Sequence, residues 1–136
     1  MGQVGVLYRI KKSDLENIGK KKGFEEKDIV DMDKRWEATM YVLADGFPWS
    51  LPFERILMPK NVIEVSDREP CRYHNETDIK EMNIHLSEIS EAKIRARAED
   101  KIAQDDKDLI IEDVMDIIEM FRDAEEEGDI IVAYIG

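Results

Sequence analysis

The two ends of the chain carry the patterns of β-strands, and this feature constrains the fold more than any other. Residues 129–135 form a short apolar run rich in β-branched side chains, which favours a strand over a helix. Residues 3–10 alternate in the manner of an extended strand. One face of that strand would carry the side chains of Val4, Val6, Tyr8 and Ile10. A lone strand leaves its backbone N–H and C=O groups unpaired, so we expect both segments in the same sheet. The sequence leaves open whether they pair parallel or antiparallel.

The first half of the chain also carries helical patterns. Ser13 and Glu16 form a capping box, which predicts a short helix. Asp31 is a candidate N-cap for a second helix, which Gly46 would end. At helical spacing this second helix would bury Met32, Trp36, Met40 and Leu43.

The middle and the second half differ in regularity. All four prolines lie within residues 46–73, which we expect to be a connecting segment folded over the core, with a short strand near residues 61–65. A long helical pattern begins at Asn75 and breaks near Ser90, and a last helix has Gly128 as its natural C-cap. The chain of 136 residues therefore predicts a single α+β domain, in which a small sheet with both terminal strands packs against several helices.

The charge of the chain is unevenly distributed. Residues 1–68 hold 12 Lys and Arg against 12 Asp and Glu, whereas residues 69–136 hold 8 against 20. The net charge of −12 thus arises entirely in the second half. Because such acidity opposes binding to a phosphate backbone, we expect no nucleic-acid partner.

The sequence carries no signal for a membrane or for export. No run approaches the roughly 20 apolar residues that span a bilayer, and the N-terminus lacks the charged and apolar regions of a secretory signal. We therefore expect a cytoplasmic location and no membrane partner. The single cysteine excludes an internal disulfide.

Several of these pieces together resemble the YfbM-like family of bacterial and archaeal domains. The first piece is an N-terminal strand that begins Met-Gly. The second is a helix that ends near Gly46 and opens with the run Asp-Met-Asp-Lys-Arg-Trp at residues 31–36. The third is an acidic helical segment that begins at about Asn75. The closing helix, glycine and strand contribute Phe121, Ala124, Gly128 and residues 130–135. The resemblance spans nearly the whole chain and implies a compact α+β fold and a cytoplasmic location. The family has no established activity, so the resemblance implies no site.

The first candidate site is polar and consists of Asp31, Asp33, Lys34, Arg35 and Trp36. At a helix N-terminus, free N–H groups and the helix dipole attract anions. In the structural alternative Asp31 caps the helix, Asp33 meets the dipole and Trp36 joins the core. The two basic residues would then face water or pair with carboxylates.

Metal and catalytic motifs are weak. Cys71 and His74 have C-x-x-H spacing, but His85 is the only other histidine and there is no second cysteine. A zinc site needs three or four ligands, so we expect no metal and no cofactor. The chain also lacks phosphate-binding glycine loops and the nucleophile-elbow pattern. We therefore assign no catalytic residue and favour a protein that is not an enzyme.

The second candidate site is a row of like charges. Between residues 105 and 129, 12 carboxylates are opposed only by Lys107 and Arg122. At spacings of 4, 4, 3, 4 and 4 residues, one helix face would carry Asp108, Glu112, Asp116, Glu119, Asp123 and Glu127. Each neighbouring pair costs about 0.2–0.5 kcal/mol, and the last pair also crowds the negative end of the helix dipole. A sequence that breaks a local rule without visible compensation is a candidate functional site.

Two functional hypotheses from different classes follow. The first is a non-catalytic interaction or regulatory module, of immunity type in its most concrete form, that binds a basic protein through the acidic helix. The second is a small enzyme or ligand-binding domain with a pocket near residues 46–73. A flat, acidic surface with an apolar centre would favour the first hypothesis. A deep pocket lined by His74, Cys71 or Asp31 would favour the second. The sequence does not determine the oligomeric state.

Overall fold

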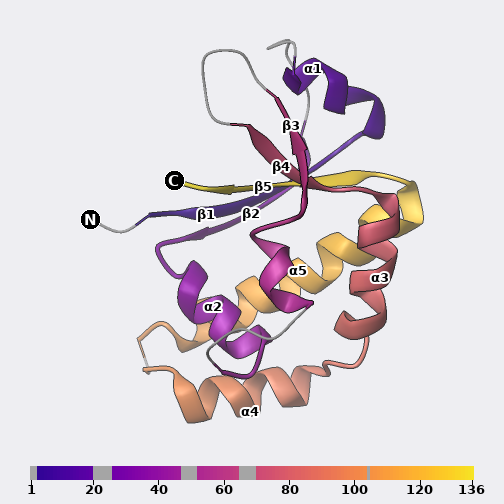
Figure 1. Cartoon of the computed structure of the whole chain (residues 1–136). Helices are drawn as coiled ribbons and strands as arrows, with labels where there is room; N and C mark the ends of the chain where they lie inside the picture. Colours follow the sequence, from indigo (N-terminus) through magenta and orange to yellow (C-terminus); the bar gives the residue numbers. More distant parts are fainter. Residues whose placement is uncertain (1–2, 20–25, 47–51, 65–69, 104) are drawn as a thin grey trace.

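A five-stranded antiparallel sheet with strand order β2-β1-β5-β4-β3 forms the centre of the molecule (Figure 1). The computed structural model describes residues 3–19, 26–46, 52–64, 70–103 and 105–136. The strands are β1 (Gly5–Ile10), β2 (Glu26–Asp33), β3 (Asn61–Ile63), β4 (Cys71–His74) and β5 (Ile130–Ile135). The two terminal strands, β1 and β5, pair antiparallel along their full length. This confirms that both ends of the chain lie in one sheet and establishes the direction of their pairing.

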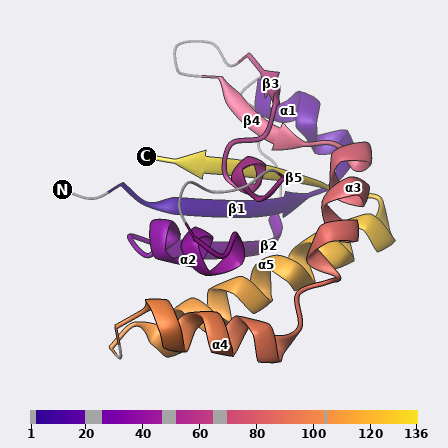
Figure 2. The same ribbon diagram turned by 60° about the horizontal axis from the view of Figure 1, so that its bottom comes forward.

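The helices divide between the two faces of the sheet. They are α1 (Leu15–Gly19), α2 (Trp36–Leu43), α3 (Glu76–Leu86), α4 (Glu91–Lys101) and α5 (Lys107–Glu127). Two short 3-10 turns, η1 (Lys12–Asp14) and η2 (Phe53–Ile56), precede α1 and β3. Figures 1 and 2 show α2, α3, α4 and α5 on one face of the sheet, with α5 in contact with the other three and with β2. We call this side the helix face, and α1 lies on the opposite face.

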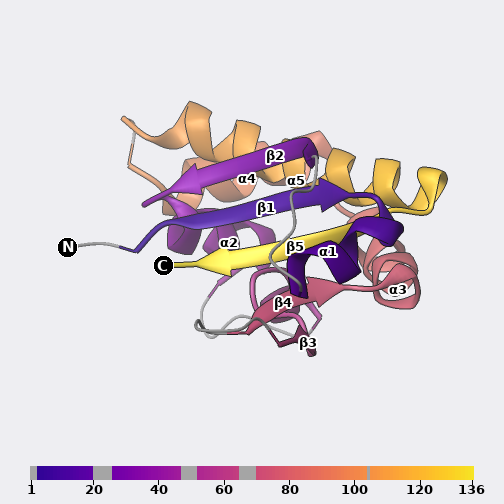
Figure 3. The same ribbon diagram turned by 90° about the horizontal axis from the view of Figure 1, so that it is seen from above.

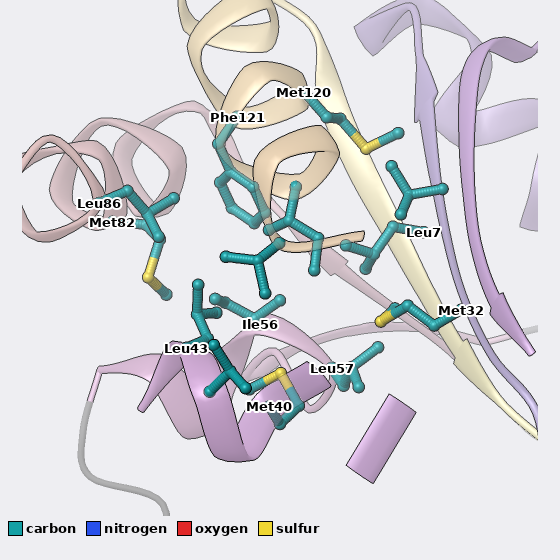
Figure 4. Close-up of a cluster of buried hydrophobic side chains, with 14 of the residues drawn as sticks. Leu7, Met32, Met40, Leu43, Ile56, Leu57, Met82, Leu86, Met120 and Phe121 are labelled. Atoms are coloured by element: carbon teal, nitrogen blue, oxygen red, sulfur yellow. The ribbon is translucent and has the colours of Figure 1, made fainter. Parts of the chain in front are cut away.

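The main core fills the space between the sheet and the helix face. Figure 4 shows Leu7 and Met32 from the strands meeting Met120 and Phe121 from α5 and Leu43 from α2. These side chains are fully buried, and burial of each stabilises the fold by about 1.5–3 kcal/mol. A smaller cluster under α1 joins Ile10, Ile18, Ile130 and Val132.

The expected second helix begins later than its pattern predicts. Asp31 and Met32 lie in β2, and α2 starts only at Trp36, after a turn at residues 34 and 35. Alternate burial in β2, with Val30 and Met32 buried between exposed residues, is the two-residue period of a strand. The Asp31 cap is therefore wrong, because pairing with β1 stabilises an extended backbone there. The apolar residues of the predicted stripe are nevertheless buried or packed against the core.

In the second half of the chain, α3 and α4 begin and α5 ends at the residues where the sequence predicts helix ends. The side chains of Asn75 and Ser90 accept hydrogen bonds from Asp78 N–H and Lys93 N–H, which caps α3 and α4. Gly128 ends α5 with a φ of 73°, the left-handed conformation that favours glycine. In the first half, by contrast, Ser13 lies within η1 and caps no helix.

The proline-containing segment contributes the edge strand β3 and most of its neighbour β4 as well as loops. Of its described residues, 61–63 form β3, as expected, and 71–73 belong to β4, which the sequence did not predict. Buried Ile56 and Leu57 tie the segment to the main core, which confirms that it folds over the core.

Candidate functional site

Arg35, from the first candidate site, reaches a buried carboxylate of α5. Its Nε and Nη2 atoms donate to Oδ2 and Oδ1 of Asp113 at 3.1 and 3.2 Å, a two-point ion pair. The hydroxyl of Thr39 donates to the same carboxylate at 3.2 Å. Asp113 is only 6% exposed, and burial raises its pKa more than the bonds from Arg35 and Thr39 lower it. The pair therefore joins the start of α2 to α5 and is a structural link.

The other members of the first candidate site make separate contacts. The carboxylate of Asp31 accepts the backbone N–H of Asp33 at 2.9 Å, and Asp33 has a positive φ of 49°. Lys34 is exposed and forms no ion pair with the described residues. The indole Nε1 of Trp36 donates to the carbonyl of Gln3 at 2.9 Å. The predicted anion site at a helix N-terminus is thus not assembled in this form, because Asp31 and Asp33 belong to the strand.

The second candidate site, the acidic row, lies on the solvent side of α5. All of its members are exposed except Asp123, which is half-buried. Within the part of the chain that the structure describes, no ion pair involves Asp108, Glu112, Asp116, Glu119 or Asp123. Burial raises the pKa of Asp116, and the neighbouring carboxylates, first Glu112, raise it further. This is the electrostatic repulsion that the spacing predicts.

The last member of the row, Glu127, is compensated by two cations. It pairs with Nη1 of Arg9 and lies 3.9 Å from Nζ of Lys27. The carboxylate of Asp129, which is only 3% exposed, accepts hydrogen bonds from Nη1 of Arg9 at 2.9 Å and from Nζ of Lys27 at 3.0 Å. The expected absence of compensation at this end of the row is therefore wrong, because β1 and β2 place two basic residues beside it.

The row runs beside the edge of the sheet. The described edge strand β2 contacts α5, and Figure 3 shows α5 behind it. Asp28 of β2 is among the carboxylates that raise the pKa of Asp116. The acidic surface therefore extends from the exposed side of α5 onto β2.

Cys71 and His74 lie on the same strand but on opposite faces. Three positions along β4 separate them, and Cys71 packs with the cluster under α1. His74 is 1% exposed, its Nε2 donates to the carbonyl of Ile56 at 2.8 Å, and its ring contacts Phe121 edge-to-face. Burial lowers the pKa of His74 to about 4. The two residues therefore share no site, and His74 is a neutral residue of the core.

An open cavity of about 490 Å³ lies where β4 and β5 separate. The last described pair between these strands is Arg72 with Ala133, beyond which β5 continues to Ile135. The walls include Leu57, Met58, Cys71, Arg72, Tyr134 and Ile135. Its volume lies within the range of small-molecule sites, about 300–1,000 Å³. A second cavity, beside His74, has a volume of about 40 Å³ and has room for water only.

Metal-binding clusters and membrane-spanning helices are both absent from the described residues. No group of three or more His, Cys, Asp or Glu side chains is placed to hold a metal ion. None of the helices there has the length and apolar character needed to cross a bilayer. The absence of a metal or cofactor from the protein stays a prediction.

Sequence reasoning missed the buried carboxylates. Asp113 follows Ile110 by three residues and precedes Ile117 by four, so it lies on the apolar stripe of α5. A lone carboxylate on such a stripe predicts a buried partner, and that signal was present. No comparable local signal marks Asp129 or its partner Arg9.

Comparisons with known proteins bear on the fold. The family model described as a domain of unknown function (DUF1877) matches residues 1–134. Among solved structures, the crystal structure of a protein of unknown function, YfbM from Escherichia coli, is similar with a TM-score of 0.62. The two share 16% sequence identity, and the match covers 98% of this chain and 99% of that one. At this identity the likeness supports the fold alone. No curated protein matches the chain.

Proposed function

Because the chain belongs to the family described as a domain of unknown function (DUF1877), which assigns no activity, we propose a function from the geometry. The protein is a non-catalytic, cytoplasmic interaction module, regulatory or of immunity type. Its acidic surface on α5 binds a basic protein partner.

One contrast carries the proposal. The buried carboxylates beside the acidic row are bound by cations, Asp113 by Arg35 and Asp129 by Arg9 and Lys27. The members of the row from Asp108 to Asp123 have no such partner among the described residues. A basic protein would relieve their mutual repulsion on binding, and the field of the row would speed and orient its approach.

The test removes charge from the row without touching its paired end. The row variant combines Glu112→Gln, Asp116→Asn, Glu119→Gln and Asp123→Asn. Glu127 is left unchanged because its replacement would break the pair with Arg9. The matched control removes four exposed carboxylates that form no ion pair with the described residues: Glu37→Gln, Glu54→Gln, Glu81→Gln and Glu88→Gln. Both variants change the net charge by the same amount.

Each variant is used for affinity capture from a lysate of the cells that make the protein. We expect the row variant to lose specifically captured basic proteins that the control variant retains. The retained proteins should dissociate when salt is raised, because the Debye length falls from about 10 Å at 0.1 M to about 3 Å at 1 M. Capture that survives in the row variant would refute a role of the acidic row.

A second candidate function rests on the cavity between β4 and β5. Its position beside the described part of the proline-containing segment is the one expected for a small enzyme or ligand-binding domain, and Cys71 lines it. Arg72 at its wall donates from Nη1 to the carbonyl of Pro59 at 3.1 Å, and the remaining donors of its guanidinium would favour a small apolar acid. Titration with a series of aliphatic carboxylic acids tests this, with amide shifts expected at Met58, Arg72 and Ile135. Shifts spread over the whole surface would argue against it.

A further inference from the structure

The face of the sheet opposite α2–α5 carries aromatic and acidic side chains in adjacent rows. Antiparallel register places Asp31, Val6 and Tyr134 side by side across β2, β1 and β5. The next row contains Ile29 and Tyr8. Because directly opposed residues share a face, all of these side chains lie on one side of the sheet.

Of the side chains in these rows, Ile29, Asp31 and Tyr134 are exposed, whereas Tyr8 is half-buried and Val6 is buried. Ile29 is 49% exposed and Tyr134 is 52% exposed, whereas most apolar side chains of the helix face are fully buried. Figure 3 shows α1 over β5 and β4, where it packs on Ile130 and Val132. We call the half-buried Tyr8 and the exposed Ile29, Asp31 and Tyr134 together the tyrosine patch.

The tyrosine patch is flanked by negative charge. Asp31 lies within it, and Glu26 pairs with Ile10 in the row beyond Ile29. Burial raises the pKa of Tyr8, and Glu26, Asp31 and Tyr134 raise it further, so these groups are electrostatic neighbours. The described residues of these strand rows include no Lys or Arg. The patch therefore has an aromatic and apolar centre with an acidic border.

The neighbouring sheet edge is partly occupied by its own side chains. The backbone N–H of Ile29 donates to the carboxylate of Asp28 at 2.9 Å, and that of Asp33 donates to Asp31 at 2.9 Å. An added strand would need such free N–H groups to form a ladder. A partner at β2 therefore docks through side chains on the face of the sheet rather than as a sixth strand.

We infer that the tyrosine patch is the docking surface for a basic protein that presents arginine beside apolar side chains. This inference rests on the proposed function and names the contact that would supply affinity. A guanidinium stacks on a tyrosine ring and pairs with a carboxylate at once, which suits Tyr134 and Asp31 in one row. The apolar neighbours pack on Ile29. The acidic row of α5, on the other side of β2, attracts the same partner.

A second copy of this chain fits the patch poorly. A symmetric dimer through this face brings Asp31 and Glu26 of both copies onto one small interface, and each chain carries a net charge of −12. Like charges brought together in this way oppose association. Charge complementarity thus selects a basic partner.

The experiment uses the whole chain labelled with ¹⁵N and a blocked Leu-Arg-Leu-Arg-Leu peptide. The control peptide has citrulline in place of arginine, which keeps the length and planar end group but lacks the charge and two N–H donors. We expect the arginine peptide to shift the amides of Tyr8, Ile29, Asp31 and Tyr134 in a saturable way, and the citrulline peptide to bind at least about 5-fold more weakly.

Variants of the protein distinguish binding at the tyrosine patch from non-specific binding to the rest of the surface. Tyr134→Thr removes the ring and Ile29→Thr removes the apolar contact, and each should weaken binding by about 2- to 5-fold. Tyr134→Phe keeps the ring and should bind like the wild type. Val62→Thr makes the same kind of change on the opposite edge strand, where Val62 is 44% exposed, and should also have no effect.

The possible outcomes separate this inference from the proposed function. Shifts confined to α5 that vanish in the row variant would overturn the patch and leave the acidic-row proposal standing. Shifts at the patch that persist unchanged in the row variant would support the patch and refute the role of the row. Equal binding of the citrulline peptide, or patch shifts that depend on protein concentration alone, would overturn the patch as an arginine-binding surface.

Discussion

The carboxylates of α5 and of the turn that follows it form two groups with opposite surroundings. Asp113 and Asp129 are buried, and each is bound by cations from distant segments. Glu112, Asp116 and Glu119 are exposed and form no ion pair within the described residues. A buried carboxylate must be paired because its desolvation is costly, whereas water solvates an exposed one. In so acidic a chain, burial and not sequence position distinguishes structural carboxylates from those available to a partner.

The largest expected effect is at Asp129. Asp129→Ala leaves Arg9 and Lys27 with Glu127 as their one carboxylate partner among the described residues, and we expect the free energy of unfolding to fall by about 3–5 kcal/mol. Urea unfolding followed by circular dichroism measures it. The control is Glu126→Ala, an exposed carboxylate without a described ion pair, which should stay within about 0.5 kcal/mol of the wild type. Equal effects of the two substitutions would contradict the distinction between buried and exposed carboxylates.

Breaking the ion pair between Arg35 and Asp113, which links α2 to α5, should have the next largest effect on stability. Arg35→Ala leaves Asp113 with Thr39 as its one side-chain donor in the described part of the chain, and we expect a loss of about 2–4 kcal/mol in the free energy of unfolding. The double variant Arg35→Ala with Asp113→Ala should lose less stability than the sum of the losses in the two single variants, because the buried charge of Asp113 is then also gone. Strict additivity in this double-mutant cycle would mean that the two residues do not interact.

His74 is a buried titratable residue like Asp113 and Asp129, but it carries an imidazole in place of a carboxylate. Burial lowers the pKa of His74 to about 4, so the unfolded chain, with a histidine pKa of about 6.5, takes up the proton first. The contribution of His74 is complete above pH 6.5 and is lost as the pH falls towards 4, by up to about 3 kcal/mol. Unfolding curves at several pH values should show this slope in the wild type and in exposed His85→Gln. The slope should be weaker in His74→Gln, and an unchanged slope there would place the titration elsewhere.

The smallest effect on stability is expected from the exposed group. The row variant removes all five neighbouring like-charge pairs of the row, among them those of Asp116 with Glu112 and Glu119. It should raise the free energy of unfolding by about 1–2.5 kcal/mol at low salt. The gain should shrink towards zero in 1 M NaCl, where charges are screened within about 3 Å. A loss of stability would show that these carboxylates have stabilising partners within the chain.

The parts of the fold that the sequence predicted are those with local signals. Asn75, Ser90 and Gly128 act on backbone groups within a few residues, so α3 and α4 begin, and α5 ends, close to where the pattern placed them. Strand β2 was missed because its residues are compatible with a helix until β1 pairs with them. The acidic row was predicted from spacing alone, whereas the tyrosine patch depends on the register of three strands.

The sequence by itself determined the two terminal strands, the capped helices and the acidic row, because each is written in neighbouring residues and a fixed period. Only the tertiary structure decided which charges are paired. The partners of the two buried carboxylates lie far away in sequence: Arg9 is 120 positions from Asp129, and Arg35 is 78 positions from Asp113. Such pairs form only when the sheet and α5 come together. Folding removes Asp113 and Asp129 from water while leaving most of the row exposed, and so separates the carboxylates that are paired within the fold from those that water solvates.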